Sequence, residues 1–178
     1  MTVRVNKPAF DIREKLTQLD SAQVPYDKMP GGSVIQVVNK RATSDQTVSV
    51  NSWTAINDMY ATIYPKFVDS KIWIHVMSHY YVQSTSSAPA WTGANYRLHS
   101  NKDGVLIDDP DYGQAIYAPD TAFRYMGHRF FTYVDTPNTT KPITYTVYGK
   151  CHNSNAAIQF HRGDYGMQGL ITLMEIRQ

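Results

Sequence analysis

The stretch that decides the fold is residues 71–82, "KIWIHVMSHYYV". Successive side chains of a strand point to opposite faces. One face of this stretch carries Ile72, Ile74, Val76, Tyr80 and Val82. The other face carries Trp73, Met77 and Tyr81. A strand with one wet face alternates apolar and polar residues, so this pattern predicts a strand that is covered on both sides.

The last strand signal, "GLITLMEI" at residues 169–176, repeats the pattern, with Ile171 and Leu173 on one face and Met174 on the other. One face can build a core, but the other needs a covering element or another subunit, because a large apolar patch usually marks an interface. Strong helix patterns are rare in the chain, so we predict a homo-oligomer built on sheet faces. The predicted subunit-interface residues are Trp73, Met77, Tyr81 and Met174.

Seven more segments carry strand signals separated by Gly, Pro, Asn, Asp and Ser clusters. They are residues 33–40, 46–53, 59–65, 93–101, 127–136, 142–150 and 155–162. Nine strands in one domain predict an all-β fold, an antiparallel sandwich or a barrel. A domain of about 150 residues buries roughly 68–70% of the surface of its unfolded chain, which is enough for a full core.

Residues 1–28 differ from the rest of the chain and predict an arm, a short helix and a linker. Asp11 and Glu14 form a capping box for a helix over about residues 12–20. Isolated helices below roughly 12–15 residues are marginal in water, so this helix must dock on something. Its anchor residues are Phe10, Ile12, Leu16 and Leu19. Residues 21–32 are a linker or an ordinary surface loop, and the β-sandwich domain is predicted over residues 29–178.

The charge balance excludes two classes of partner. Seventeen Lys and Arg against fifteen Asp and Glu give a net charge of +2, so we expect no nucleic-acid binding and no polybasic membrane patch. No apolar run approaches the roughly 18 residues of a membrane span, so we expect no membrane insertion. Cys151 is the one cysteine, which rules out an intrachain disulfide and a cysteine-rich zinc site.

Three motifs suggest metal or adhesion chemistry, but none of them predicts a site. His75 and His79 share a strand face about 13 Å apart at ~3.3 Å per residue, too far to ligate one ion within a chain without a bulge. One histidine from each of three subunits around an axis stays an alternative. "DDPD" at residues 108–111 lacks the pattern of an EF-hand loop and favours a turn. "RGD" at residues 162–164 is a weak match, since Gly163 and Gly166 suit a turn.

Catalytic motifs are missing from the sequence: there is no Gly-x-Ser-x-Gly elbow, His-Glu-x-x-His, phosphate loop or dinucleotide fingerprint. We therefore expect a protein that is not an enzyme and has no cofactor. A glycan-cleaving enzyme stays an alternative, because two distant carboxylates can meet in a fold.

Aromatic residues in polar segments are candidates for binding. The segment 83–96 reads as a polar loop, and residues 108–125 add further tyrosines. Rings with a polar handle on a rigid sandwich suit the face of a sugar. The candidate receptor-binding residues are Trp91, Tyr96, Tyr112 and Tyr117. The alternative is that Trp91 packs under its own loop and the tyrosines fill the subunit interface.

Three pieces of the sequence resemble known proteins when taken together. "MTVRVNKPAFDIREKLTQLD" resembles the N-terminal segment of virion structural proteins of marine bacteriophages, especially phages of cyanobacteria. "GGSVIQVVNK" and "IYPKFVDSKIWIHV" resemble the start of a β-domain of phage fibre proteins, and "ITYTVYGK" with "LITLMEIRQ" resembles its close. The resemblance does not extend to residues 83–126.

The resemblance implies a homotrimeric tail fibre or appendage of the virion, assembled in the host cytoplasm. It implies a jelly-roll-like head, an N-terminal segment that binds other virion proteins, and neither enzymatic activity nor a cofactor. The unmatched loops are then expected to serve host attachment, with a host cell-surface glycan as the partner. A capsid decoration or cement protein, and a carbohydrate-binding module, are the alternatives.

Overall fold

The computed structural model describes residues 25–49, 52–84, 90–108, 115–118, 123–152 and 156–178. The predicted N-terminal helix, its anchor residues Phe10, Ile12, Leu16 and Leu19, and the candidate binding residue Tyr112 lie outside the described residues.

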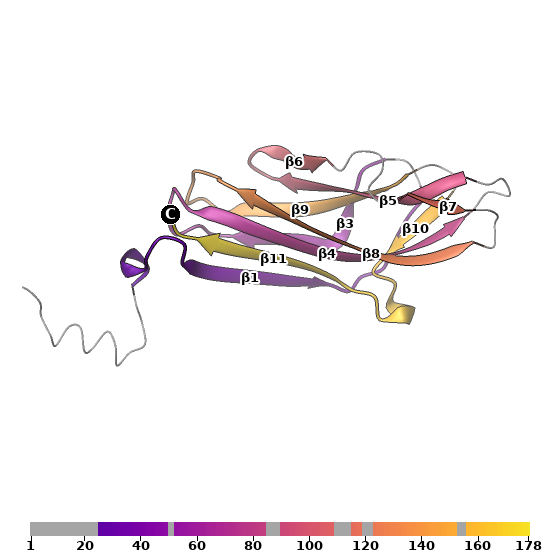
Figure 1. Ribbon diagram of the computed structural model, residues 1–178, viewed down its shortest axis with the longest axis horizontal. Helices are drawn as coiled ribbons and strands as arrows, with labels where there is room; N and C mark the ends of the chain where they lie inside the picture. The colour runs from indigo at the N-terminus through magenta and orange to yellow at the C-terminus, as the bar shows by residue number, and fades with distance from the viewer. Residues whose placement is uncertain (1–24, 50–51, 85–89, 109–114, 119–122, 153–155) are drawn as a thin grey trace, which may run out of the picture.

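Within the described residues, eleven strands form two antiparallel sheets that face each other (Figure 1). The first sheet contains β1 (Val34–Ala42), β11 (Gly169–Ile176), β4 (Lys71–Ser84) and β8 (Arg124–Asp135), with β10 (Ala156–Phe160) and β2 (Gln46–Val48) extending it. The second contains β3 (Thr54–Ile63), β9 (Ile143–Cys151), β5 (Ala90–Ser100), β6 (Gly104–Asp108) and β7 (Ala115–Ala118). Two 3₁₀ turns, η1 (Tyr26–Lys28) and η2 (Gly163–Tyr165), complete the described elements.

The strand order is that of a jelly roll. One sheet has the order β1-β11-β4-β8 and the other β3-β9-β5-β6, and the chain repeatedly crosses from one sheet to the other. This arrangement confirms the predicted all-β, jelly-roll-like antiparallel sandwich. The sequence patterns located nine of the strands and missed β6 and β7, which are short.

The strand β4 is the centre of the first sheet. Along one edge it pairs with β8 over nearly its whole length. Along the other edge it pairs first with β11 and then with β10. Both edges of β4 are therefore paired with neighbouring strands along most of their length.

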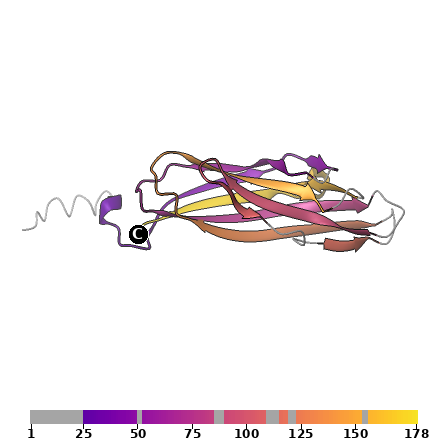
Figure 2. The same cartoon turned by 90° about the horizontal axis from the view of Figure 1, so that it is seen from above.

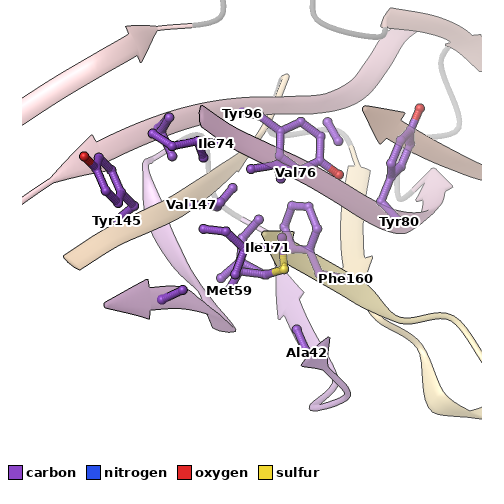
Figure 3. Close-up of a cluster of buried hydrophobic side chains, with 14 of the residues drawn as sticks. Ala42, Met59, Ile74, Val76, Tyr80, Tyr96, Tyr145, Val147, Phe160 and Ile171 are labelled. Carbon is purple, nitrogen blue, oxygen red and sulfur yellow. The ribbon is translucent and has the colours of Figure 1, made fainter. Parts of the chain in front are cut away.

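The core lies between the inner faces of the two sheets. The predicted inner residues of β4, Ile72, Ile74, Val76, Tyr80 and Val82, all have no exposed surface. Figure 3 shows Ile74 and Val76 close to Val147 of β9 and Ile171 of β11. Each aliphatic side chain of this kind contributes roughly 1.5–3 kcal/mol on full burial.

A buried carboxylate closes one end of the sandwich. Glu175 on β11 has no exposed surface, and its oxygens accept four hydrogen bonds. The donors are the backbone N–H groups of Lys66 (2.7 Å) and Phe67 (3.3 Å), the Ser70 hydroxyl (2.6 Å) and the Gln36 amide (2.5 Å). Glu175 therefore ties the connection between β3 and β4 to the first sheet.

The C-terminal end of β11 also holds the start of the described chain. The Arg177 guanidinium donates to the carbonyl oxygens of Tyr26 (2.7 Å) and Met29, and the Gly32 N–H donates to the Arg177 carbonyl (2.8 Å). Consequently η1 lies beside the C-terminus at one end of an elongated molecule (Figure 2). The boundary between residues 28 and 29 stays a prediction.

Replacing Glu175 by Ala should cost on the order of 3 kcal/mol of unfolding free energy, because it leaves several donors without their acceptor. Urea unfolding measures the effect. The matched control is Lys71→Ala, an exposed position directly opposite Ile176, which should stay within about 0.5 kcal/mol of wild type. Equal stabilities of the two variants would show that the carboxylate does not hold this end together.

Candidate functional site

The outer face of the β1-β11-β4-β8 sheet carries an apolar row that crosses all four strands. The register places Val134 opposite Trp73, Trp73 opposite Met174 and Met174 opposite Val37. Val134, Trp73 and Val37 are 50%, 43% and 51% exposed, although all three are large hydrophobic residues. Side chains directly opposite each other in a sheet touch, so this row is one continuous apolar strip.

A second apolar row runs parallel to the first. It joins Phe130, Met77 and Leu170, and it ends at Arg41. Between the two rows lies a polar row formed by Thr132, His75, Thr172 and Asn39. We call these two apolar rows with the polar row between them the outer patch.

No negative charge lies on the outer patch. The two carboxylates of its four strands, Asp135 and Glu175, are both buried. Asp135 accepts a hydrogen bond from the Tyr145 hydroxyl at 2.7 Å, and burial is the main reason why the pKa of that phenol is raised. A partner that covers the outer patch would therefore not have to desolvate a carboxylate.

The predicted interface residues divide into two groups. Trp73, Met77 and Met174 lie in the apolar rows of the outer patch. Tyr81 is only 9% exposed, because its ring stacks on Tyr165 at 6.2 Å and the Arg162 guanidinium lies 4.6 Å from the ring centroid. The prediction that Tyr81 needs another subunit to cover it is therefore wrong, since the η2 segment of its own chain does so.

The outer face of the other sheet is more polar, although it also exposes Tyr60 (45%) next to Thr146 and Val105 (46%) next to His99. Its rows place Tyr148 opposite Arg97, and Thr146 opposite His99. The Arg97 guanidinium forms an ion pair with Asp108 at 2.7 Å and stacks on the Trp53 ring. Asp108 of the "DDPD" stretch is thus engaged by an arginine. The two outer faces of the sandwich differ in kind, and the apolar one is the candidate site.

Two of the candidate binding residues form an exposed pair at the other end of the molecule. Trp91 on β5 lies opposite Tyr117 on β7, and their rings meet edge to face at 5.6 Å. They are 58% and 50% exposed. In Figure 1, β7 lies at the end far from the C-terminus.

The prediction that Tyr96 faces a ligand is wrong. Tyr96 is 1% exposed, donates a hydrogen bond to the Ser78 hydroxyl at 3.2 Å and packs edge to face on Phe160. The cause is that the strand predicted over residues 93–101 begins already at Ala90, so Tyr96 and Trp91 lie on one strand and point to opposite faces.

A buried histidine joins Tyr96 and Ser78, and the sequence offered no signal for this contact. His161 has no exposed surface, its Nε2 lies 3.2 Å from the Ser78 hydroxyl, and its backbone has a φ of 52°. Burial, with a smaller contribution from His79, lowers the pKa of His161 to about 4. Because Ser78 and Tyr96 are also buried, this trio stabilises the core rather than meeting a substrate.

The remaining motifs have structural roles in the described part of the chain. Arg162 and Asp164 of the "RGD" triplet pair at 3.5 Å, and Gly166 takes a φ of 64°, which confirms the turn. Among the residues that the structure describes, no group of three or more His, Cys, Asp or Glu side chains is placed to hold a metal ion. In the same residues no helix is long and apolar enough to cross a membrane.

Comparisons with known proteins give similar structures only. No protein-family model matches the chain, and no curated protein matches it. Similar solved structures include the infectious bursal disease virus Gt strain (14% identity, 82% of this chain, TM-score 0.35) and the VP2 subviral particle of that virus (12%, 80%, 0.37). Dimeric latent PorU from Porphyromonas gingivalis also matches (6%, 83%, 0.38).

This chain covers 38% of each of the two viral chains and 14% of the PorU chain. At these TM-scores the matches transfer no residue role and no function to it. They do not support the narrower resemblance to marine bacteriophage proteins, which is left as a proposal.

The buried His161 should make stability depend on pH. Its pKa is about 4 in the folded state and about 6.5 in the unfolded chain, so the unfolded state binds more protons between these values. Stability contributed by neutral His161 is therefore present above pH 6.5 and is lost as the pH falls toward 4, by about 2 kcal/mol between pH 7 and 4.5.

Urea unfolding at both pH values checks this slope. His161→Asn, which tolerates the positive φ, should flatten it, whereas His99→Asn on the polar outer face should keep the wild-type slope. An unchanged slope in His161→Asn would assign the pH dependence to other groups.

Proposed function

We propose that the chain is a non-enzymatic structural protein of a bacteriophage particle, a homotrimeric fibre or appendage component. Its subunits meet through the outer patch. The observation that carries the proposal is the contrast between the two outer faces: one is crossed by continuous apolar rows, and on the other Tyr60 and Val105 are separated by polar side chains. The jelly-roll fold and the resemblance of the sequence to phage virion proteins support it.

The composition of the outer patch suits a subunit interface. Aromatic and Met side chains are enriched in interfaces, and the patch contains Trp73, Phe130, Met77 and Met174. Trp73 occupies the middle of its row with apolar neighbours on both sides, which is the setting of an interface hot spot. Burial of such surface stabilises association by roughly 25 cal/mol per Å² of apolar area, before the cost of immobilising the subunits.

The two ends of the molecule differ, which suits a protein that points one end toward the particle and the other away from it. The described chain begins at η1, next to the C-terminus, and the Trp91–Tyr117 pair lies at the opposite end (Figure 1). In the proposed arrangement the N-terminal segment binds other virion proteins, and the far end faces the host. A capsid decoration or cement protein would use the same patch, and antibody labelling of purified particles separates the two locations.

Light scattering on the full chain at micromolar concentration should give three times the mass of one chain. Trp73→Glu places a charge in the middle of the apolar row and should give a folded monomer, which unfolds in urea in one cooperative transition whose midpoint no longer depends on protein concentration. Thr146→Glu, on the polar outer face, is the matched control and should stay trimeric. A wild-type monomer, or a trimer that Trp73→Glu leaves intact, contradicts an interface on this patch.

A second candidate function is carbohydrate recognition, favoured by the exposed Trp91–Tyr117 pair. Sugar rings pack their apolar faces on aromatic side chains. Binding of the full chain to host cell-surface polysaccharide should fall at least tenfold in Trp91→Ala, about 1.4 kcal/mol. Tyr64→Ala is the control, because Tyr64 is 60% exposed but belongs to the connection held by Glu175. Polysaccharide binding that survives Trp91→Ala and Tyr117→Ala would show that this pair is not the binding site. Release of reducing ends from the polysaccharide would contradict a non-enzymatic role.

A further inference from the structure

A hollow of about 300 Å³ lies where β4 and β8 meet the η2 segment. It is lined by His79, Met126, Gly127, His128, Tyr165 and Met167. Gly127 also lines it, and the core leaves no room for a side chain there, since a Cβ would lie 2.6 Å from the buried Tyr80 ring. The side chains that line this hollow belong neither to the core cluster nor to the two apolar rows of the outer patch.

Two imidazoles lie side by side in the lining of the hollow, edge to face. His79 on β4 and His128 on β8 are direct cross-strand partners, and their ring centroids are 6.0 Å apart. A nitrogen ligand lies roughly 2.0–2.1 Å from a metal ion and its ring centroid about 1 Å farther, so two rings can share an ion up to about 6 Å apart. The spacing of His79 and His128 is therefore within the range of a common ion.

The orientation of His79 is that of a metal ligand. Its Nδ1 lies 2.5 Å from the carbonyl oxygen of Gln168. A carbonyl oxygen only accepts hydrogen bonds, so Nδ1 carries the proton and the neutral ring has its lone pair on Nε2. Metal-binding histidines almost always donate their second ring N–H in this way, because the bond sets the tautomer and the ring orientation. His128 is held from the other side, where its ring packs on Phe130 at 4.9 Å.

The other donors at the hollow are soft. Met126 lies two residues before His128 on β8, on the same face of the strand, and is 54% exposed. Met167 lies just after η2 and is nearly buried. Thioether sulfurs and imidazole nitrogens together favour monovalent copper over Zn²⁺, Mg²⁺ or Ca²⁺.

We propose that His79 and His128, with the thioethers of Met126 and Met167, form a binding site for Cu(I). The ion joins β4, β8 and the segment after η2 at the edge of the outer patch. The site goes beyond the proposed assembly and does not depend on it, because all four donors come from one chain.

Anaerobic competition between the full chain and a chromophoric Cu(I) chelator tests the site. One Cu(I) should bind per chain. His79→Ala and His128→Ala should each weaken binding at least a hundredfold, and Met126→Leu at least tenfold. Two controls should keep the wild-type affinity: His99→Ala on the polar outer face, and Cys151→Ala, which removes the one buried thiol.

Several results would overturn the proposal. The wild-type chain could fail to compete with the chelator, or His79→Ala and His128→Ala could leave binding unchanged. Binding could also be lost in Cys151→Ala, or Zn²⁺ could bind as tightly as Cu(I). Metal-free urea midpoints that match wild type show that the variants are folded. X-ray absorption of the Cu(I)-loaded protein should detect both nitrogen and sulfur ligands, and nitrogen alone would contradict the role of the methionines.

Discussion

The strand β4 is apolar on both faces and hydrogen-bonded on both edges, and the rest of the structure is arranged around it. Its edges pair with β8 on one side and with β11 and then β10 on the other, so it is a central strand of the sheet. Its inner face packs on the second sheet and creates the core. On its outer face, Trp73 and Met77 are covered only by the side chains beside them on β8 and β11.

The outer patch follows from this arrangement because the neighbouring strands are apolar in the same rows. Val134 and Phe130 come from β8, and Met174 and Leu170 come from β11. Near one end of β4 the chain covers the outer face itself, since η2 brings Tyr165 onto Tyr81. The patch that is left exposed lies toward the end closed by Glu175 and Arg177. One strand therefore connects the core, the candidate interface and the end of the molecule at which the described chain begins.

Residue alternation was enough to predict much of this fold. Spacing alone predicts apolar side chains on both faces of β4 and β11, and it leads directly to Trp73, Met77 and Met174. Alternation failed at the start of β5, where Trp91 was placed in a loop, and where short strands such as β6 carry little pattern. It also cannot report contacts between distant segments. Ser78 and His161, or Tyr81 and Tyr165, come together only through the sheet topology, and no local pattern encodes which residue will cover which.

The central claim is that the outer patch of β1, β11, β4 and β8 joins the subunits of an assembly. An experimental structure of the full-length protein in its assembled form tests this most directly. The account predicts a threefold assembly in which Trp73 and Val134 of each subunit are buried against a neighbouring subunit, while Arg97 and Tyr148 stay in solvent. An assembly that joins through the Arg97 and Tyr148 face and leaves Trp73 in solvent would contradict it.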